Sequence, residues 1–288
     1  MANQREDTLH YGPDWRGSGA YSRRLRIAAQ LSAAPSGDFK RSSNELILMT
    51  VRSRHVMETL KGTKISTLTP QELLGRPLND VERKYAPPKL YLASNEKVPL
   101  PIPRSAIVGS RRASPESMRT AGEIAKVLVR KGVIIVSGLA EGIDTAAHKA
   151  SIEGGGRTIA VLGTPVDRVY PKENFKLQEE IMHRHYAVSQ FPIGHRTRPK
   201  DFVLRNRTMA LLCDASIIVE AGETSGSLHQ GWEALRLGRP LFIWSSLMKD
   251  SALSWPKKMA QYGAVELDDP EQVLDVLPSS ERILEVSP

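Results

Sequence analysis

The chain has 288 residues, of which 40% are hydrophobic and 25% are charged, a balance that excludes a protein disordered throughout. Its formal net charge of +8 favours polyanionic partners, although such a charge also serves simple solubility. The single cysteine, Cys213, excludes an intramolecular disulfide and a cysteine-based zinc site. A polar N-terminus and the lack of a long apolar run predict a soluble, cytoplasmic protein without membrane contact.

Residues 1–40 are expected to form a flexible basic arm with one short helix at 22–33. Glycine and proline interrupt this segment, and Arg23, Arg24 and Arg26 cluster within it. These arginines would serve either as an additional nucleic-acid arm or as a solvated tail, and the sequence does not choose between the two.

Residues 41–98 are predicted to form a small helical region and linker. Ser43 and Gly62 bound one expected helix, and Thr69, followed by proline, opens a second. The proline-rich segment 97–103 then stiffens the entry to the next domain.

Residues 99–288 are predicted to form a Rossmann-like domain, because short apolar runs alternate with helices of about ten residues. Strands are expected at 106–108, 133–136, 158–162, 187–188, 216–220 and 240–244. Helices are expected at 114–130, 144–153, from 171 onward, at 204–212 and at 227–237. The right-handed crossover rule then gives a doubly wound sheet. The predicted fold class is α/β: an extended Rossmann-like, mostly parallel sheet with a small helical N-terminal region.

Loops rich in glycine and serine follow four of these strands, at 109–111, 137–144, 163–164 and 222–227. In such sheets ligands bind beyond the carboxyl ends of the strands. Glycine permits close backbone approach, and the free amides of a helix start favour an anion. Four such loops at one edge, with Arg111 in one of them, predict a pocket that binds phosphate groups.

Other chemistries find little support in the sequence. It has no P-loop and no clean dinucleotide fingerprint after the first strand, so no nucleotide cofactor is expected. His183 and His185 show no metal-site spacing, and no metal is expected. Asp144, His148 and Glu220 are candidates for catalysis in principle. We favour structural roles, in which Asp144 caps a helix and His148 packs on it.

The segment 202–207 is a second candidate binding element. Arg205 and Arg207 flank Asn206, and Phe202 lies close by. Arginine grips phosphates with two hydrogen bonds, asparagine bonds a base edge or a phosphate, and phenylalanine stacks on a base. The alternative is a solvated basic helix start with a phenylalanine in the core.

These segments together resemble the DprA/Smf family (DNA-processing protein A). The matching stretches, which occur in the family's order within residues 86–268, are 107–111, 137–148, 155–163, 170–174, 202–207, 219–221 and 225–228. The resemblance implies an extended Rossmann fold, usually dimeric, that binds single-stranded DNA in a basic pocket. It also implies a role in loading RecA recombinase during DNA uptake and recombination, as in natural transformation and competence, and no enzymatic activity.

The resemblance also implies which residues meet the DNA. The expected DNA- and phosphate-binding residues are Gly109, Ser110, Arg111, Ser137, Gly138, Lys172, Phe202, Arg205, Asn206, Arg207, Ser225, Gly226 and Ser227. The loops at 137–138 and 225–227 would form the floor of the pocket with their backbone amides. Lys172 would add charge near the rim. No catalytic residue is expected.

Two other functions stay open from the sequence. One is a nucleotide sensor or phosphoribohydrolase-like enzyme, because the segment 222–233, ending in Glu233, loosely resembles the glycine-rich loop of such Rossmann proteins. The Pro-Gly-Gly-x-Gly-Thr pattern of those enzymes is absent from it. The other is a structural subunit of a larger DNA-processing complex with a vestigial pocket, against which the presence of Arg111, Arg205 and Arg207 argues.

Overall fold

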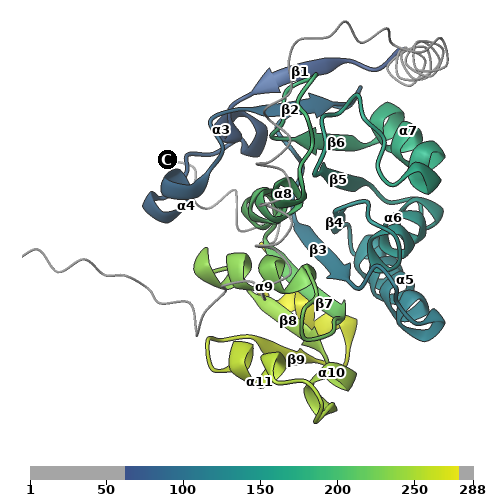
Figure 1. The fold of residues 1–288 in the computed structure, drawn as a ribbon, viewed down its shortest axis with the longest axis vertical. Helices are drawn as coiled ribbons and strands as arrows, with labels where there is room; N and C mark the ends of the chain where they lie inside the picture. Colours follow the sequence, from purple (N-terminus) through teal and green to yellow (C-terminus); the bar gives the residue numbers. More distant parts are fainter. Residues whose placement is uncertain (1–61, 279–288) are drawn as a thin grey trace, which may run out of the picture. The chain divides into compact units, whose positions relative to one another are not determined.

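The computed structural model describes residues 62–278 (Figure 1). The basic arm expected at residues 1–40, its helix at 22–33 and the helix expected to begin at Ser43 therefore lie outside the described residues. The strands are β1 (Ile65–Leu68), β2 (Leu90–Ala93), β3 (Arg104–Gly109), β4 (Ile134–Ser137), β5 (Thr158–Leu162), β6 (Tyr186–Ser189), β7 (Ala215–Glu220), β8 (Leu241–Trp244) and β9 (Val265–Leu267). They form one nine-stranded sheet in the order β1-β2-β6-β5-β4-β3-β7-β8-β9.

The helices that connect these strands are α3 (Pro70–Leu74), α4 (Asp80–Tyr85), α5 (Pro115–Arg130), α6 (Ile143–Glu153), α7 (Phe175–Arg184), α8 (Pro199–Leu212), α9 (Ser227–Arg236), α10 (Ser245–Lys249) and α11 (Trp255–Ala260). Two 3-10 helices, η1 (Lys172–Asn174) and η2 (Pro270–Val276), complete the described part. Every strand and helix expected between residues 106 and 237 is present, with ends that differ by a few residues.

The sheet is mostly parallel, as predicted. All pairs from β6 across to β9 are parallel, and only the pairs β1–β2 and β2–β6 are antiparallel. The chain winds from β3 through β4 and β5 to β6 in one direction, and from β7 through β8 to β9 in the other. The strand order therefore reverses between β3 and β7, which is where open α/β sheets leave a crevice.

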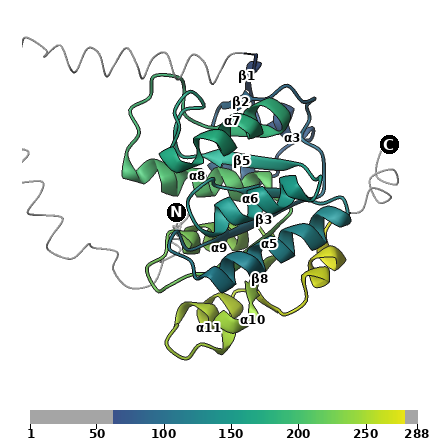
Figure 2. The same ribbon diagram turned by 90° about the vertical axis from the view of Figure 1, so that its right-hand side faces the viewer.

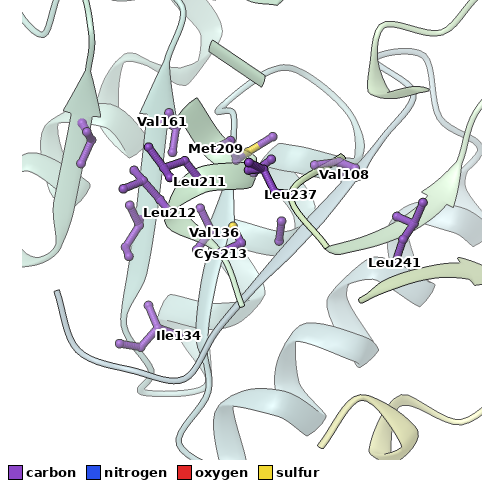
Figure 3. Close-up of a cluster of buried hydrophobic side chains, with 14 of the residues drawn as sticks. Val108, Ile134, Val136, Val161, Met209, Leu211, Leu212, Cys213, Leu237 and Leu241 are labelled. Carbon is purple, nitrogen blue, oxygen red and sulfur yellow. The ribbon is translucent and has the colours of Figure 1, made fainter. Parts of the chain in front are cut away.

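Helices cover both faces of the sheet, and side chains on each strand alternate between the two layers. Val108, Val136 and Val161 belong to the cluster that α8 covers, in which Met209 and Leu212 also lie (Figure 3). The alternate residues of β3, β4 and β7 pack on α5 and α6, which Figure 2 shows in front of the sheet. This burial on both faces explains why the strands read as continuous apolar runs in the sequence.

The region preceding residue 99 differs from the expectation. The capping box of α3 is present, because the backbone amide and hydroxyl of Thr69 donate to the Glu72 carboxylate and Oγ1 accepts from the Glu72 amide. The same region, however, contributes β1 and β2, which extend the main sheet at β6. Each has only four residues, and β2 lies in the stretch that was read as linker. Strands from both sides of residue 98 share the sheet, and a domain boundary there stays a prediction.

The helices of residues 62–278 include none with both the length and the apolar character that crossing a bilayer requires.

Candidate nucleic-acid interface

A cavity of about 840 Å³ opens where the strand order reverses. Its walls come from the loops after the five strands β3 to β7, from α8 and from the first turn of α9. The carboxyl ends of five parallel strands and the N-terminal ends of two helices therefore meet at one place, as the glycine and serine loops predicted.

The structure brings most of the predicted site residues to this cavity. Those that line it are Gly109, Ser110, Arg111, Phe202, Arg205, Asn206, Ser225, Gly226 and Ser227. Those that do not line it are Ser137, Gly138, Lys172 and Arg207. The loops after β3 and β7 and the start of α8 thus converge, whereas the loop after β4 reaches the cavity at Ala140 but not at Ser137 or Gly138.

Arg205 lies at the floor of the cavity and is a structural cation rather than an exposed one. Its side chain is buried, with 5% of the residue exposed. Nη1 donates to the carbonyl oxygens of Val161, at 2.9 Å, and of Gly138, while Nε donates to Asn206 Oδ1 at 2.9 Å. Burial lowers the pKa of the guanidinium, and the nearby Asp144 carboxylate opposes that shift. Arg205 therefore joins β5, the loop after β4 and α8 beneath the ligand space.

The loop at 137–138 was expected to offer backbone amides to a ligand, and the structure contradicts this. The Asp144 carboxylate accepts the amide of Gly138 at 3.1 Å and that of Ala140 at 3.3 Å. A Cβ at Gly138 would lie 1.7 Å from Arg205 Nη1. The glycine is therefore required by the close approach of the arginine, and the amides are already bound to a carboxylate of the chain itself.

Asp144 and His148 have structural partners, although Asp144 binds the preceding loop instead of capping α6, whose N-cap is Gly142. Desolvation raises the pKa of Asp144, and Arg205 partly offsets this. His148 is fully buried, with Nδ1 2.6 Å from Thr158 Oγ1. Burial, with the nearby His185 and Arg205, lowers the pKa of His148 to about 3, so its ring is neutral at pH 7.

Glu220 has a structural role at the point where the strand order reverses. Its carboxylate accepts the amide and the hydroxyl of Ser114, both at 3.0 Å, and thereby holds the end of β7 to the start of α5. Burial acts to raise the pKa of Glu220, but hydrogen bonds from Ser117 and Ser114 outweigh it and hold the pKa below its usual value. Residues 62–278 contain no group of three or more His, Cys, Asp or Glu side chains that could hold a metal ion.

The walls of the cavity are strongly basic. Besides Arg205, four exposed arginines line it, namely Arg111, Arg112, Arg168 and Arg198. Within the described part of the chain, none of the four forms an ion pair with a carboxylate. Asp144 is the one acidic side chain among the described lining residues, and loop amides already bind it. Such a cavity attracts an anion that carries several charges.

Sequence reasoning missed three of these arginines. Arg112 directly follows Arg111, Arg168 lies in the loop after β5, and Arg198 is the N-cap residue of α8. All three follow from the same rule that predicted the site, because they lie in loops at the carboxyl edge of the sheet. The search for glycine and serine passed over them.

An aromatic pair lies among the arginines. The ring centroids of Phe202 and Tyr170 are 5.2 Å apart at an angle of 49°, and the guanidinium carbon of Arg111 lies 5.5 Å from the Phe202 centroid. A Cβ at Gly163 would come within 2.5 Å of the Phe202 ring, so the ring rests on the backbone there. Tyr170 is 47% exposed. Aromatic faces beside cations are the combination that holds the bases and phosphates of a single strand.

Lys172 and Arg207 point to other parts of the surface. Lys172 is exposed in η1, outside the cavity lining. Arg207 Nε donates to Glu233 at 3.2 Å. Residues two apart on a helix face directions about 200° apart, so Arg205 and Arg207 cannot serve the same surface.

Known sequences are similar to this chain over about two thirds of its length. A model of the family described as DNA recombination-mediator protein A matches residues 74–278. DNA processing protein DprA of Bacillus subtilis (strain 168) is 34% identical over 195 residues, which cover 67% of this chain and 66% of the relative. The Streptococcus pneumoniae DprA is 36% identical over 195 residues, or 68% and 69% of the two chains. Protein Smf of Escherichia coli (strain K12) is 34% identical, with less than half of its length, 46%, covered.

Two solved structures share the fold. The DprA of Streptococcus pneumoniae superposes with a TM-score of 0.65 at 27% identity, covering 90% of this chain and 93% of that one. The DprA of Helicobacter pylori, whose structure concerns a single-stranded DNA binding mode, gives a TM-score of 0.61 at 25% identity and covers 77% and 96%.

Proposed function

The chain belongs to the DNA recombination-mediator protein A family, and from that premise we propose that it binds single-stranded DNA in the cavity at the ends of β3, β5 and β7. The family is one of DNA-processing and DNA-binding proteins and is not a known enzyme family. The related Helicobacter pylori protein has a described single-stranded DNA binding mode.

One observation carries the proposal: arginines without carboxylate partners in the described chain surround a pair of aromatic rings. Arg111 illustrates the arrangement, because it is exposed and lies over the Phe202 ring. Phosphates of the strand bind the guanidinium groups, and an unpaired base stacks against Tyr170 or Phe202. Base-paired DNA would keep its bases out of reach of these rings, so the site prefers a single strand.

The test is fluorescence anisotropy with a labelled oligo-dT of about 30 nucleotides, compared with a duplex of the same length. Arg111→Ala should weaken binding to all sequences alike and reduce the log–log salt slope by about 0.7. The matched control is Arg130→Ala, an exposed arginine at the C-terminal end of α5, remote from the cavity. Equal binding by the wild type and the Arg111 variant, or binding that does not depend on salt, contradicts the proposal.

We further propose that the protein acts as a homodimer and promotes loading of a RecA-type recombinase on the bound strand. The description of its family as recombination mediators supports this role. For a dimer, exposed apolar side chains gather beside a second cavity of about 580 Å³ next to β9, where Tyr262 is 65% and Val265 54% exposed. Val265→Asp should then yield a monomer in sedimentation analysis, and a dimer that persists in this variant would place the contact elsewhere.

Recombinase loading has its own readout. The protein should shorten the lag of RecA filament growth on strands covered by single-strand-binding protein, and Arg111→Ala should remove the effect. If the wild-type protein binds DNA but leaves the lag unchanged, the loading role is contradicted, whereas the proposed DNA-binding site is not.

The alternative of a nucleotide-hydrolysing enzyme loses support from the position of Glu233. Its carboxylate binds both Arg207 and Arg236, and the residue does not line the cavity. A general base must reach the substrate, which Glu233 does not do here.

A further inference from the structure

A second basic cluster lies outside the cavity, around Tyr85 of α4. The guanidinium carbon of Arg236 lies 3.6 Å from the centre of the Tyr85 ring, and that of Arg207 lies 5.5 Å from it. The Glu233 carboxylate accepts Nε of Arg207 at 3.2 Å and Nε of Arg236 at 2.8 Å. We call Tyr85, Arg207, Glu233 and Arg236 the Tyr85 cluster.

The Tyr85 cluster keeps a positive balance and a fixed geometry. Lys84 Nζ also lies 5.5 Å from the centre of the Tyr85 ring, so three cations surround the ring, and a single carboxylate, Glu233, pairs with two of them. The tyrosine ring and the carboxylate hold the two guanidinium groups in position before any ligand arrives. Fixing donors in advance lowers the entropy lost when an anion binds.

One face of α8 connects the Tyr85 cluster to the cavity. Lys200, Val203 and Arg207 have the i, i+3, i+7 spacing that places side chains on the same side of a helix. Lys200 is exposed, and Val203, which lines the cavity, is 44% exposed. Arg207 follows Val203 by one turn, about 6 Å along the helix axis. A chain that leaves the cavity at Val203 therefore meets Arg207 next.

We propose that the Tyr85 cluster is a second contact site for the same single strand, which runs from the cavity along this face of α8. The inference rests on the proposed binding of single-stranded DNA in the cavity. The contact is made to phosphate, because the donors of the cluster are guanidinium groups, one of which already stacks on the Tyr85 ring. Binding there is consequently independent of sequence.

The exposure and bonding of Arg207 support this contact. Its side chain is 37% exposed, and its bond to Glu233 uses Nε. The two terminal nitrogens can thus point a pair of parallel N–H donors at a phosphate, the geometry in which arginine binds that group. An acidic peptide would meet the same charges, but the continuity with the cavity through Val203 favours the strand.

The experiment compares a short oligo-dT of about 6 nucleotides, within the usual range of single-strand site sizes, with a longer one of about 20, beyond that range. For the wild type, the longer strand should bind more tightly and with a steeper salt slope. Arg207→Gln should leave the short strand unaffected and lower the salt slope on the long strand by about 0.7, the share of one phosphate. The matched control is Lys126→Gln, an exposed cation on α5, on the other side of the sheet.

The outcomes separate the two proposals. The first outcome is that binding of the short strand depends on Arg111, while the Arg207→Gln variant still binds the long strand more tightly than the short one by the full wild-type factor. This outcome overturns the inference, and the cavity proposal stands. A short strand that fails to bind the wild type contradicts the cavity proposal itself. Arg207→Lys is a control against a folding defect. It keeps the positive charge but lacks the planar guanidinium group, so it should retain only part of the tighter binding of the long strand. If Arg207→Gln weakens binding of the short and the long strand equally, Arg207 stabilises the structure of the cavity, and the inference is overturned.

Discussion

The floor and the walls of the cavity both use arginine, yet the two regions treat it differently. On the floor, Arg205 is buried and satisfied by carbonyl oxygens, with the Asp144 carboxylate close enough to affect its pKa. On the walls, Arg111 and Arg168 are exposed and form no ion pair within the described residues. Burial and partners, rather than residue type, therefore decide which arginines build the fold and which remain for a ligand.

The largest expected effect on this contrast comes from replacing Arg205. Arg205→Ala should lower the free energy of unfolding by about 3 to 5 kcal/mol, because it leaves the buried Asp144 carboxylate without its cation. Urea denaturation measures the loss. Arg111→Ala, the matched change on the wall, should alter stability by less than about 0.5 kcal/mol. Similar stability losses in the two variants would erase the distinction between floor and wall.

His148, a buried histidine near the floor of the cavity, should make the stability of the folded protein depend on pH. The pKa of His148 in the folded protein is about 3, below its unfolded value of about 6.5. A lowered histidine pKa contributes stability that is present above pH 6.5 and is lost as pH falls, so between pH 7 and pH 5 the protein should lose about 2 kcal/mol. His148→Gln, which cannot be protonated, should flatten this part of the profile. An unchanged profile in that variant would show that other groups, such as His185, carry the pH dependence.

The smallest expected effect concerns the aromatic wall. Phe202→Ala should weaken binding of oligo-dT by about 1 kcal/mol, roughly fivefold, at the low end of the usual range for stacking. The low value follows from geometry, since the ring already rests on Gly163 and contacts Tyr170. Phe202→Tyr keeps an aromatic face and should bind as the wild type does. If the two variants lose the same affinity for oligo-dT, Phe202 only packs within the fold and does not stack on a base.

Most of the fold was readable from the sequence because the central strands are buried on both faces and so appear as apolar runs. The exceptions lie at the sheet's ends. Strand β1 (Ile65–Leu68) is half polar, β2 (Leu90–Ala93) follows a proline pair, and β9 (Val265–Leu267) has only three residues. Such short edge strands are specified by pairing with a neighbour rather than by their own pattern.

The candidate site was readable in position but only partly in detail. The loops predicted the correct edge of the sheet, and Arg111 and Phe202 lie there as expected. Arg205 and Gly138 were read as ligand contacts because sequence proximity to the motif says nothing about burial. The 100° rotation per helical residue would have separated Arg205 from Arg207 in advance, whereas the pairing of Asp144 with loop amides needs the tertiary structure.

The most direct test of the account is ultraviolet crosslinking of oligo-dT to the full chain, followed by mass spectrometry of the crosslinked peptides. Crosslinks should fall on peptides that contain Phe202 or Tyr170, the aromatic residues of the cavity, and should diminish in Arg111→Ala but not in Arg130→Ala. Crosslinks confined to other aromatic residues, such as Trp232 or Tyr262, would contradict the claim that the strand binds in this cavity.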